Sequence, residues 1–268
     1  MDAAYAAKKQ KEAEATRLLA SIDDYLLAEL GITLPPEPKN TTQNRIFTRR
    51  LSDLSGKRFD APVHHKNYSL HSKNYPMQSL KDCVFINPAS PFYKHTPDTE
   101  ISFIPMENVS DVYGEADISD TIRIEKSKGY TRFQENDLLW AKITPCMQNG
   151  KSAVVSGLKH GLGCGSTEFH VFRAKSDIDI TYIAGLLRLK SLRDYAVLFF
   201  SGSAGHQRVS DDFFKQLSIP KPPLPKQRAI AAHITTIRQQ AKQLQAEAKA
   251  GLEQAKAEIE AIILGDAA

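Results

Sequence analysis

Apolar residues near the end of the chain recur at steps that alternate mostly between four and three residues. This spacing is typical of a coiled-coil seam and predicts one long helix over residues ~224–264, roughly 60 Å long at 1.5 Å per residue. Four prolines between Pro220 and Pro225 precede it and hold the backbone extended, so the joint before the helix should be stiff. The seam positions are Ile230, Ile234, Ile237, Ala241, Leu244, Ala248, Ala255, Ile259 and Ile262.

A second apolar stripe predicts a helix over residues ~3–30, with Gly31 as its C-cap. A helix with one apolar stripe is not stable alone in water, so we expect the two terminal helices to pack antiparallel. The alternative, that both helices simply cap the core of the domain between them, stays open on the sequence. The stripe consists of Ala15, Leu19, Ile22, Leu26 and Leu30.

Between the helices the pattern changes to short β-rich runs separated by Gly, Pro, Asn and Asp, with one helix expected from Asp179 to Phe199. The runs include Cys83–Ile86, Ile101–Ile104, Ile122–Ile124, Ala153–Val155 and Phe169–Phe172. The sequence therefore predicts an α+β chain with one mixed, partly barrel-like β-sheet domain and two long helices forming an antiparallel coiled coil. The expected boundaries are 1–32 for the first helix, 33–44 for a proline-rich linker, 45–222 for the domain and 223–265 for the last helix.

The composition is that of an ordinary folded chain, with 268 residues of which 41% are hydrophobic and 25% are charged. No apolar run approaches the roughly 20 residues that cross a bilayer, and the first residues lack the apolar core of a secretory signal. Three widely spaced cysteines fit a reducing compartment, so we expect a cytoplasmic protein without membrane contact. Residues 40–225 hold 24 Lys and Arg against 19 Asp and Glu, so the net positive charge lies in the expected domain.

The motifs of common catalytic sites are missing from the sequence. It contains no G-x-x-x-x-G-K-[ST] phosphate loop, no G-x-S-x-G nucleophile elbow, and no Asn-Pro-Pro-Tyr or Asp-Pro-Pro-Tyr run of the kind that adenine methyltransferases use. Gly161–Gly165 is rich in glycine but precedes a strand, unlike a dinucleotide-binding turn. We therefore expect no catalytic residues and no bound cofactor.

Two other constellations were weighed as sites. Glu168 and Asp177 could belong to a nuclease cluster, but no lysine stands at nuclease spacing, so we expect them to cap strands and turns. A zinc site could be drawn from Cys146, His160, Cys164 and His170. Their spacing matches no standard finger and the chain has no C-x-x-C, so buried thiols and surface imidazoles are the preferred interpretation and no metal is expected.

Polar groups suited to DNA contact gather in three expected loops. Gln and Asn can bond adenine, Lys and Arg can bond guanine or phosphate, and glycine lets a backbone approach phosphates. Each loop alone could equally be a solvated turn, but three of them in one basic domain favour a DNA-binding surface. The first loop carries Lys142, Thr144, Gln148, Asn149 and Lys151, the second Ser203, Gly205, His206, Gln207 and Arg208, and the third Lys66, Tyr68, His71, Lys73 and Tyr75.

Four segments of the chain follow motifs with a fixed order and spacing. Asp137–Pro145 is similar to G-D-I-L-x-x-K-x-x-P, and Gly163–Arg173 to G-x-x-S-T-E-F-x-V-x-R. Ser201–Ser210 resembles a Gly/Gln loop, and Phe214–Ala231 is similar to L-x-x-L-x-I-P-x-P-P-L-x-x-Q-x-x-I-A. Together they resemble a target recognition domain in the specificity (S) subunit of type I restriction-modification systems, and the helix ending at Ile32 resembles the one that precedes the second such domain.

The resemblance implies a non-catalytic subunit whose domain reads a short half-site in double-stranded DNA. Modification (M) methyltransferase subunits would dock on the helices and bring S-adenosylmethionine for adenine methylation, and a restriction (R) subunit would add ATP-driven cleavage. Family members usually carry two recognition domains, whereas this chain shows one, so it resembles a C-terminal half or a half-size subunit. We therefore expect an interrupted palindromic target and a homodimer joined through the terminal helices, at Ile22, Leu26, Ile230, Ile234, Ile237 and Leu244.

Two other functions stay open on the sequence alone. A coiled-coil adaptor would use the domain for protein contacts and would never touch nucleic acid. A nuclease with an unrecognised site would cut duplex DNA without a partner chain once a divalent metal is added.

Overall fold

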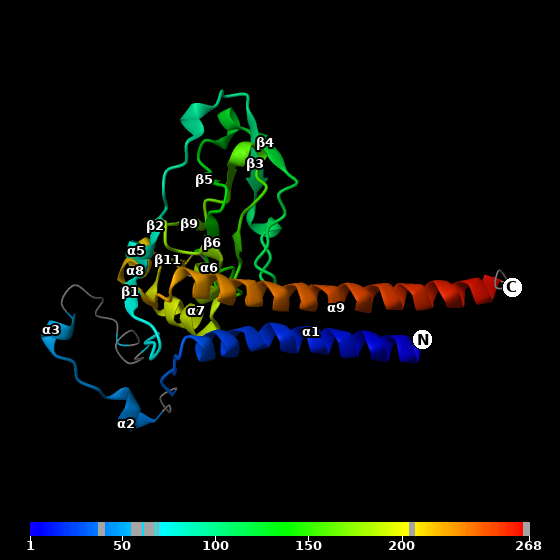
Figure 1. The fold of residues 1–268 in the computed structure, drawn as a ribbon, viewed down its shortest axis with the longest axis horizontal. Coiled ribbons are helices and arrows are strands. Elements are labelled where there is room, and N and C mark those ends of the chain that lie inside the picture. Colours follow the sequence, from blue (N-terminus) through cyan, green and yellow to red (C-terminus); the bar gives the residue numbers. More distant parts are fainter. Residues whose placement is uncertain (37–40, 55–60, 62–67, 69, 204–206, 265–268) are drawn as a thin grey trace.

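The computed structural model describes residues 1–36, 41–54, 61, 68, 70–203 and 207–264. Figure 1 shows a head, residues 70–220, mounted on a rod of two helices, α1 (Asp2–Glu29) and α9 (Leu224–Leu264), which run side by side in opposite directions. As the residue number rises along α1, the residue of α9 that it contacts has a lower number, as expected for antiparallel helices. Lys11 Nζ lies 2.6 Å from Glu247 Oε2, and further along the rings of Tyr25 and His233 are 4.2 Å apart. The expected packing of two long antiparallel helices is therefore observed.

The described strands form two four-stranded sheets and two short pairs. The central sheet contains β2 (Val84–Ile86), β6 (Leu138–Ala141), β7 (Ser152–Val154) and β9 (Phe169–Ala174), in the order β2-β9-β6-β7. The distal sheet contains β3 (Glu100–Ile104), β4 (Thr121–Arg123), β5 (Thr131–Gln134) and β8 (Leu162–Gly165), in the order β4-β3-β8-β5. The short pairs are β1 (Met77–Ser79) with β12 (Ser218–Pro220) and β10 (Phe200–Ser201) with β11 (Arg208–Val209). The expectation of one sheet is wrong, because the described strands divide between two sheets of open strand order.

Short helices lie around the sheets and before the head. They are α2 (Thr42–Arg45), α3 (Leu51–Leu54), α5 (Leu80–Cys83), α6 (Ile180–Arg188), α7 (Lys190–Ala196) and α8 (Asp211–Gln216). Single 3₁₀ turns occur at Phe92–Lys94, Met106–Asn108, Ile124–Ser127, Lys159–Gly161 and Val197–Phe199. Within the described part of the chain, no helix combines the length and the apolar character needed to span a membrane.

The helix expected from Asp179 to Phe199 is broken at Leu189, so this expectation was wrong in part. Leu189 is fully buried and has a ψ of 128°, which is not helical. The next N–H, that of Lys190, donates to Asp23 Oδ2 of α1 at 2.9 Å and so caps α7. This cap comes from Asp23 of α1, which is far away in the sequence. The local pattern therefore could not reveal the break.

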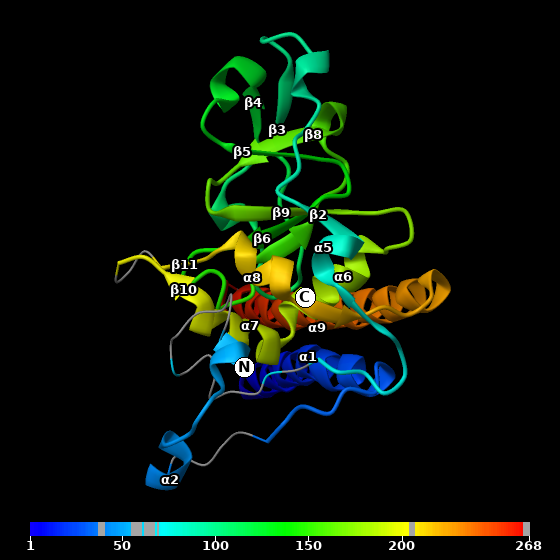
Figure 2. The same cartoon turned by 90° about the vertical axis from the view of Figure 1, so that its left-hand side faces the viewer.

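The central sheet is the middle layer of the head, between α6 and the distal sheet (Figure 2). Side chains along β6 alternate between the two neighbouring layers. Leu138 and Trp140 belong to the main core with α6, whereas Leu139 packs with Phe133 and Ile104 of the distal sheet. Burial on both faces explains why β6 has an uninterrupted apolar sequence rather than an alternating one.

Two buried or short hydrogen-bonded contacts of glutamines in α9 help to attach this helix to the head. The fully buried Gln227 accepts a hydrogen bond from the N–H of Asp179 at 2.9 Å and donates one to Pro222 O at 2.8 Å. Further along the helix, the Tyr113 hydroxyl donates to Gln245 Oε1 at 2.6 Å. At 1.5 Å per residue the two glutamines are about 27 Å apart, so these attachments fix the direction of the rod relative to the head.

The near part of the rod belongs to the core of the head. Leu244 is half-buried further along the rod, whereas the other residues expected at a subunit interface lie inside the chain. These residues pack in the main core with α6: Ile22, Leu26, Ile230, Ile234 and Ile237. Their burial matches the alternative of helices that cap the domain, while the far end of α9 leaves Ile262, Ile263 and Leu264 at least two-thirds exposed.

Candidate nucleic-acid interface

Two of the three loops expected from the sequence meet in one surface. The N–H of Thr144 donates to Gln207 O at 3.1 Å, and the N–H of Val209 donates to Lys142 O at 3.0 Å. These bonds continue the pairing of the central sheet beyond the end of β6, so backbone hydrogen bonds join the two loops. We call them the paired loops, residues 142–151 and residues 200–203 with 207–210.

The first of the paired loops exposes two side-chain amides at its tip. Gln148 and Asn149 are exposed, whereas the preceding residue, Met147, is almost fully buried and anchors the loop. The N–H of Asn149 donates to Pro145 O at 3.0 Å, and the Thr144 hydroxyl donates to the side-chain oxygen of Gln148. The loop therefore holds two groups that can read a base edge on a compact, hydrogen-bonded turn.

The two lysines of this loop are more constrained than the amides. Lys151 Nζ donates to the carbonyl oxygen of Met106 at 2.9 Å, and Lys142 is half-buried. The backbone N–H of Lys142 donates to Glu168 O at 2.9 Å. Both residues thus help to hold the loop in place, and only part of each side chain faces solvent.

Arg208 of the second paired loop is held by Glu168. Its Nε donates to Glu168 Oε2 at 2.8 Å, and its Nη2 donates to Glu168 Oε1 at 2.6 Å. The hydrogen bonds to this carboxylate raise the pKa of Arg208 above its ordinary value. Glu168 was expected only to cap a strand or turn. In the structure its carboxylate binds Arg208 and so joins β11 to the residue that directly precedes β9.

The other expected DNA contacts are less clearly grouped. Ser203 is exposed and Gln207 is half-buried in the second paired loop, while His206 lies outside the described residues. Lys73 is exposed, but its N–H donates to Gly31 O at 3.1 Å, beside the end of α1. Figure 2 shows the cyan segment that leads into α5 on the opposite side of the molecule from β10 and β11, so the structure does not bring Lys73 to the paired loops.

The residues weighed for a zinc site lie in different layers. Cys164 is buried in the distal sheet with Phe92, and burial raises the pKa of its thiol to about 12. His170 lies in the central sheet against Phe214, and with 5% of its surface exposed it is not the surface imidazole that was expected. Cys146 is half-buried and His160 is exposed. Among the described residues, no three His, Cys, Asp or Glu side chains stand together as metal ligands.

His170 links the central sheet to the second paired loop. Its Nε2 lies 2.8 Å from Val209 O and its Nδ1 lies 3.2 Å from Asn87 Nδ2. A carbonyl oxygen accepts and an amide nitrogen donates, so these partners select the neutral tautomer that carries its proton on Nε2. Burial lowers the pKa of His170 below its ordinary value.

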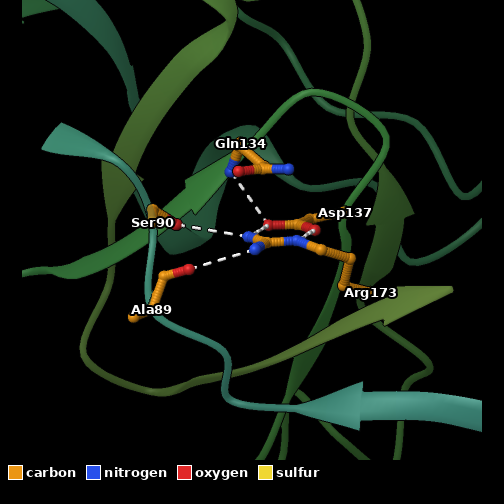
Figure 3. Close-up of polar contacts among 5 residues, drawn as sticks. All are labelled: Ala89, Ser90, Gln134, Asp137 and Arg173. Carbon is orange, nitrogen blue, oxygen red and sulfur yellow. Dashed lines mark hydrogen bonds and ion pairs between the residues drawn. The ribbon is translucent and has the colours of Figure 1, made fainter. Parts of the chain in front are cut away.

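An ion pair with a buried carboxylate supports the central sheet at the end of β6 and β9 opposite to the paired loops (Figure 3). Arg173 Nε and Nη2 each donate to Asp137 at 2.8 Å, and the Asp137 side chain has no exposed surface. The carboxylate also accepts the N–H of Gln134 at 2.9 Å, and Arg173 Nη1 donates to Ala89 O at 3.0 Å. Sequence reasoning missed this pair, although both residues stand at fixed places in the quoted motifs.

Two arginines that no motif marks also contact the first paired loop. Arg188 Nη1 donates to Ser152 Oγ at 3.1 Å and to the carbonyl oxygen of Gly150. Arg193 Nη1 donates to the carbonyl oxygen of Gln148. Both side chains reach the loop from the helices beneath it, an approach that depends on tertiary packing and leaves no local sequence signal.

A rigid rod that carries an α+β head with amide-bearing loops defines a class of recognition modules. Residues 73–254 match the sequence profile of the family described as Type I restriction modification DNA specificity domain, so this chain belongs to that family. It is 38% identical over 161 residues to the type I restriction enzyme EcoAI specificity subunit of Escherichia coli. The aligned region covers 58% of this chain and 27% of that protein. The EcoEI specificity subunit of Escherichia coli is 39% identical over 157 residues, covering 57% of this chain and 26% of that protein.

Two solved structures share the fold. One comes from a study described as the structural basis underlying complex assembly and conformational transition of the type I R-M system, with a TM-score of 0.51 at 14% identity, covering 97% of this chain and 56% of that one. The other is the HsdS subunit from Thermoanaerobacter tengcongensis, with a TM-score of 0.50 at 15% identity, covering 94% of this chain and 52% of that one. This chain thus spans about half of the solved chains, and its matched region about a quarter of the curated relatives.

Proposed function

We propose that this chain is a sequence-specific DNA-recognition subunit of a type I restriction-modification complex. The observation that carries the proposal is the joining of the two polar loops by the backbone bonds of Thr144 and Val209, in a chain of the specificity family. A ridge of two hydrogen-bonded strands with exposed amides can enter the major groove, where each base pair presents a distinct pattern of donors and acceptors.

Gln148 and Asn149 are the proposed base-reading side chains, because both are exposed and an amide can bond adenine in a bidentate way. Lys142 and Lys151 would add positive charge beside the tip, and Arg208 would face the backbone while Glu168 orients it. Ser203, His206 and Gln207 remain predicted contacts of the second paired loop. Lys73 would meet a phosphate away from this surface.

The rod supplies a second proposed role. We infer that α1 and α9 act as an antiparallel coiled coil that sets the distance between the head and a second recognition domain. The two sheets, which share the hydrophobic cluster around Phe133 and Leu139, would act together as the recognition domain expected at 45–222. Because Ile22, Leu26 and Ile230 are buried within the chain, the exposed end of α9 around Ile263 is the better surface for a partner.

The proposed partners follow from the family and from the single head. M subunits would dock on the rod and bring S-adenosylmethionine, an R subunit would bring ATP-driven cleavage, and this chain would bind neither cofactor and catalyse nothing. A second copy of the chain, or a partner chain, would read the other half-site, so a homodimer is expected on an interrupted palindrome. The complex would act on chromosomal DNA, so it would lie in the cytoplasm.

A salt titration of duplex binding by the purified chain tests the proposal. Phosphate contacts should make affinity fall with salt, with a log–log slope of roughly −0.9 for each neutralised phosphate. A duplex selected from a random-sequence library should bind tighter than its scrambled version. A chain that binds no duplex at any salt concentration, alone or with M subunits, contradicts the proposal.

The alternative is a protein-interaction adaptor, and the exposed apolar end of α9 is the observation that favours it. An adaptor would bind a partner chain through that end but would show no salt-dependent affinity for DNA. Cleavage of the duplex by the chain alone after addition of a divalent metal would instead support a nuclease.

A further inference from the structure

Two arginines from the helices beneath the first paired loop bind its backbone. Arg188, the last residue of α6, donates through Nη1 to Gly150 O and to Ser152 Oγ, the latter at 3.1 Å. Arg193, on α7, donates through Nη1 to Gln148 O and through Nε to Arg188 O at 3.0 Å. The carbonyls of Gln148 and Gly150 flank Asn149, so the two arginines grip both sides of the exposed tip.

The grip on the loop is close enough to restrict which residues the loop can contain. Gly150 has a φ of +83°, and an added Cβ there would lie 3.2 Å from Arg193 Nη1. A side chain at this position would push against the guanidinium and would also strain the backbone. Arg188 meanwhile donates through Nη2 to Asp111 O at 2.7 Å and to Val112 O at 2.9 Å, so it also ties the first paired loop to a loop of the distal sheet.

The arginines remain charged in spite of their burial. Burial, followed by the nearby charges of Arg238 and Arg193, lowers the pKa of Arg188 to about 9, which still leaves its guanidinium protonated at neutral pH. Burial also lowers the pKa of Arg193, which the charge of Asp23 opposes. Burying charged groups is costly, and Arg188 offsets this cost mostly through backbone carbonyls of the loops, those of Gly150, Asp111 and Val112, while Arg193 donates to that of Gln148. These contacts indicate that loop geometry is what the two arginines stabilise.

The same arginines connect the loop to the rod. Asp23 of α1 caps α7 through the N–H of Lys190 at 2.9 Å, three residues before Arg193. Helix α7 therefore contacts the rod through the N–H of Lys190 at its first residue, and it contacts the first paired loop through Arg193, three residues later. A displacement of α1 would move Arg193 and, with it, the backbone of Gln148.

We propose that Arg188 and Arg193 are positioning residues that set the conformation of the Gln148–Asn149 tip and thereby the sequence preference of the domain. This inference rests on the proposed function, since it assigns roles within the same DNA-reading surface. Neither guanidinium needs to touch DNA for this role, because both of them donate to loop carbonyls from beneath.

The role predicts a loss of preference rather than a loss of binding. Phosphate contacts supply sequence-independent affinity, whereas base contacts supply the difference between the right and wrong sequence. With Arg193→Gln, the preference for the selected duplex over the scrambled duplex should fall about tenfold, the scale of one lost bidentate base contact. Affinity for the scrambled duplex and the slope of its salt dependence should stay unchanged.

The experiment uses the full chain, alone and co-expressed with M subunits, with a duplex selected from a random-sequence library by the wild-type protein. Lys190→Gln is the matched control, because it removes a positive charge from the same helix and, within the described part of the chain, its side chain pairs with Asp194, one turn along α7. Arg193→Lys keeps the charge but not the planar fork, so it should recover only part of the preference. Thermal unfolding of each variant confirms that the chain is folded.

The outcomes separate this inference from the proposed function. An Arg193→Gln chain that is folded and keeps the full preference overturns the positioning role while leaving DNA recognition intact. A parallel loss of affinity for both duplexes, with a shallower salt slope, would make Arg193 a phosphate contact and overturn the inference as well. If the wild-type chain itself selects no sequence, the proposed function fails, and this inference fails with it.

Discussion

The Arg208 guanidinium and the Glu168 carboxylate meet through two parallel hydrogen bonds, 2.8 Å and 2.6 Å long. Glu168 directly precedes β9 of the central sheet, and Arg208 begins β11, which carries the second paired loop. Since the Lys142 N–H also donates to Glu168 O, one residue fastens both paired loops to the sheet. This relationship makes Glu168 the place where the geometry of the proposed DNA-reading surface can be tested most directly.

Replacing Glu168 with Gln should weaken binding to the selected duplex about tenfold, because one misplaced base contact is worth this much. Loss of a negative charge beside DNA should leave affinity for the scrambled duplex equal or higher. The pair is partly exposed, so the free energy of unfolding should fall only slightly. Fluorescence anisotropy with both duplexes measures the effect.

The control for this change is Glu125→Gln, which removes a carboxylate 3.9 Å from Arg123 in the distal sheet region. It should alter neither affinity. Equal affinities of wild-type and Glu168→Gln chains for the selected duplex would show that the clamp has no part in recognition.

Replacing Asp137 with Asn should lower the free energy of unfolding by about 3 kcal/mol, because the half-buried Arg173 charge loses a fully buried carboxylate partner. The double change Asp137→Leu with Arg173→Met should recover much of that loss, since it removes both charges together. Urea denaturation measures all three chains. Asp117→Asn, at an exposed turn where the carboxylate accepts the N–H of Ser119, is the control and should cost far less.

Replacing Gln227 with Leu should destabilise the joint between head and rod by about 2 kcal/mol, because the N–H of Asp179 and the Pro222 carbonyl lose a buried partner. Small-angle scattering should also show a broader distribution of shapes, since one of the attachments of α9 to the head is weakened. Gln254→Leu, on the exposed face of the same helix, serves as the control. An unchanged scattering profile with full stability would refute the role of Gln227 as a joint.

His170 should make the stability of the domain depend on pH. Its pKa is lowered in the folded chain by burial, while in the unfolded chain it lies near 6.5. As pH falls below about 6.5, the unfolded state takes up a proton that the folded state refuses, so stability decreases towards the lowered pKa, by at most about 1.4 kcal/mol per pH unit. The charges of Asp211 and Glu168 oppose this effect, and that of Lys142 strengthens it.

The measurement is thermal unfolding between pH 5 and 8 for the wild-type chain and for His170→Gln, both at fixed salt. The difference between the two stability curves isolates His170 from the other histidines. It should slope upward with pH below about 6.5 and be flat above it, according to the linkage between proton uptake and folding. A flat difference over the whole range would mean that His170 titrates normally in the folded chain.

Elements with a local signal could be predicted from the sequence. The long helix after Pro220 is observed as α9, and the apolar runs at Ile101 and Phe169 are observed as β3 and β9. The division into two sheets was missed because strand partners are chosen by contacts across the chain. Similarly, Asn136 takes a φ of 63° just before β6, at the position where the family motif has glycine, a conformation that only the folded backbone reveals.

The sequence by itself determined the two terminal helices, the proline joint, the α+β character and the polar composition of the paired loops, because periodicity, prolines and side-chain chemistry act over a few residues. Only the tertiary structure decided which polar groups work together. Asp137 meets Arg173, Glu168 meets Arg208, and Asp23 caps the helix that carries Arg193. Each of these pairs joins segments brought together by sheet pairing or by packing of the rod, so no local pattern could have specified them.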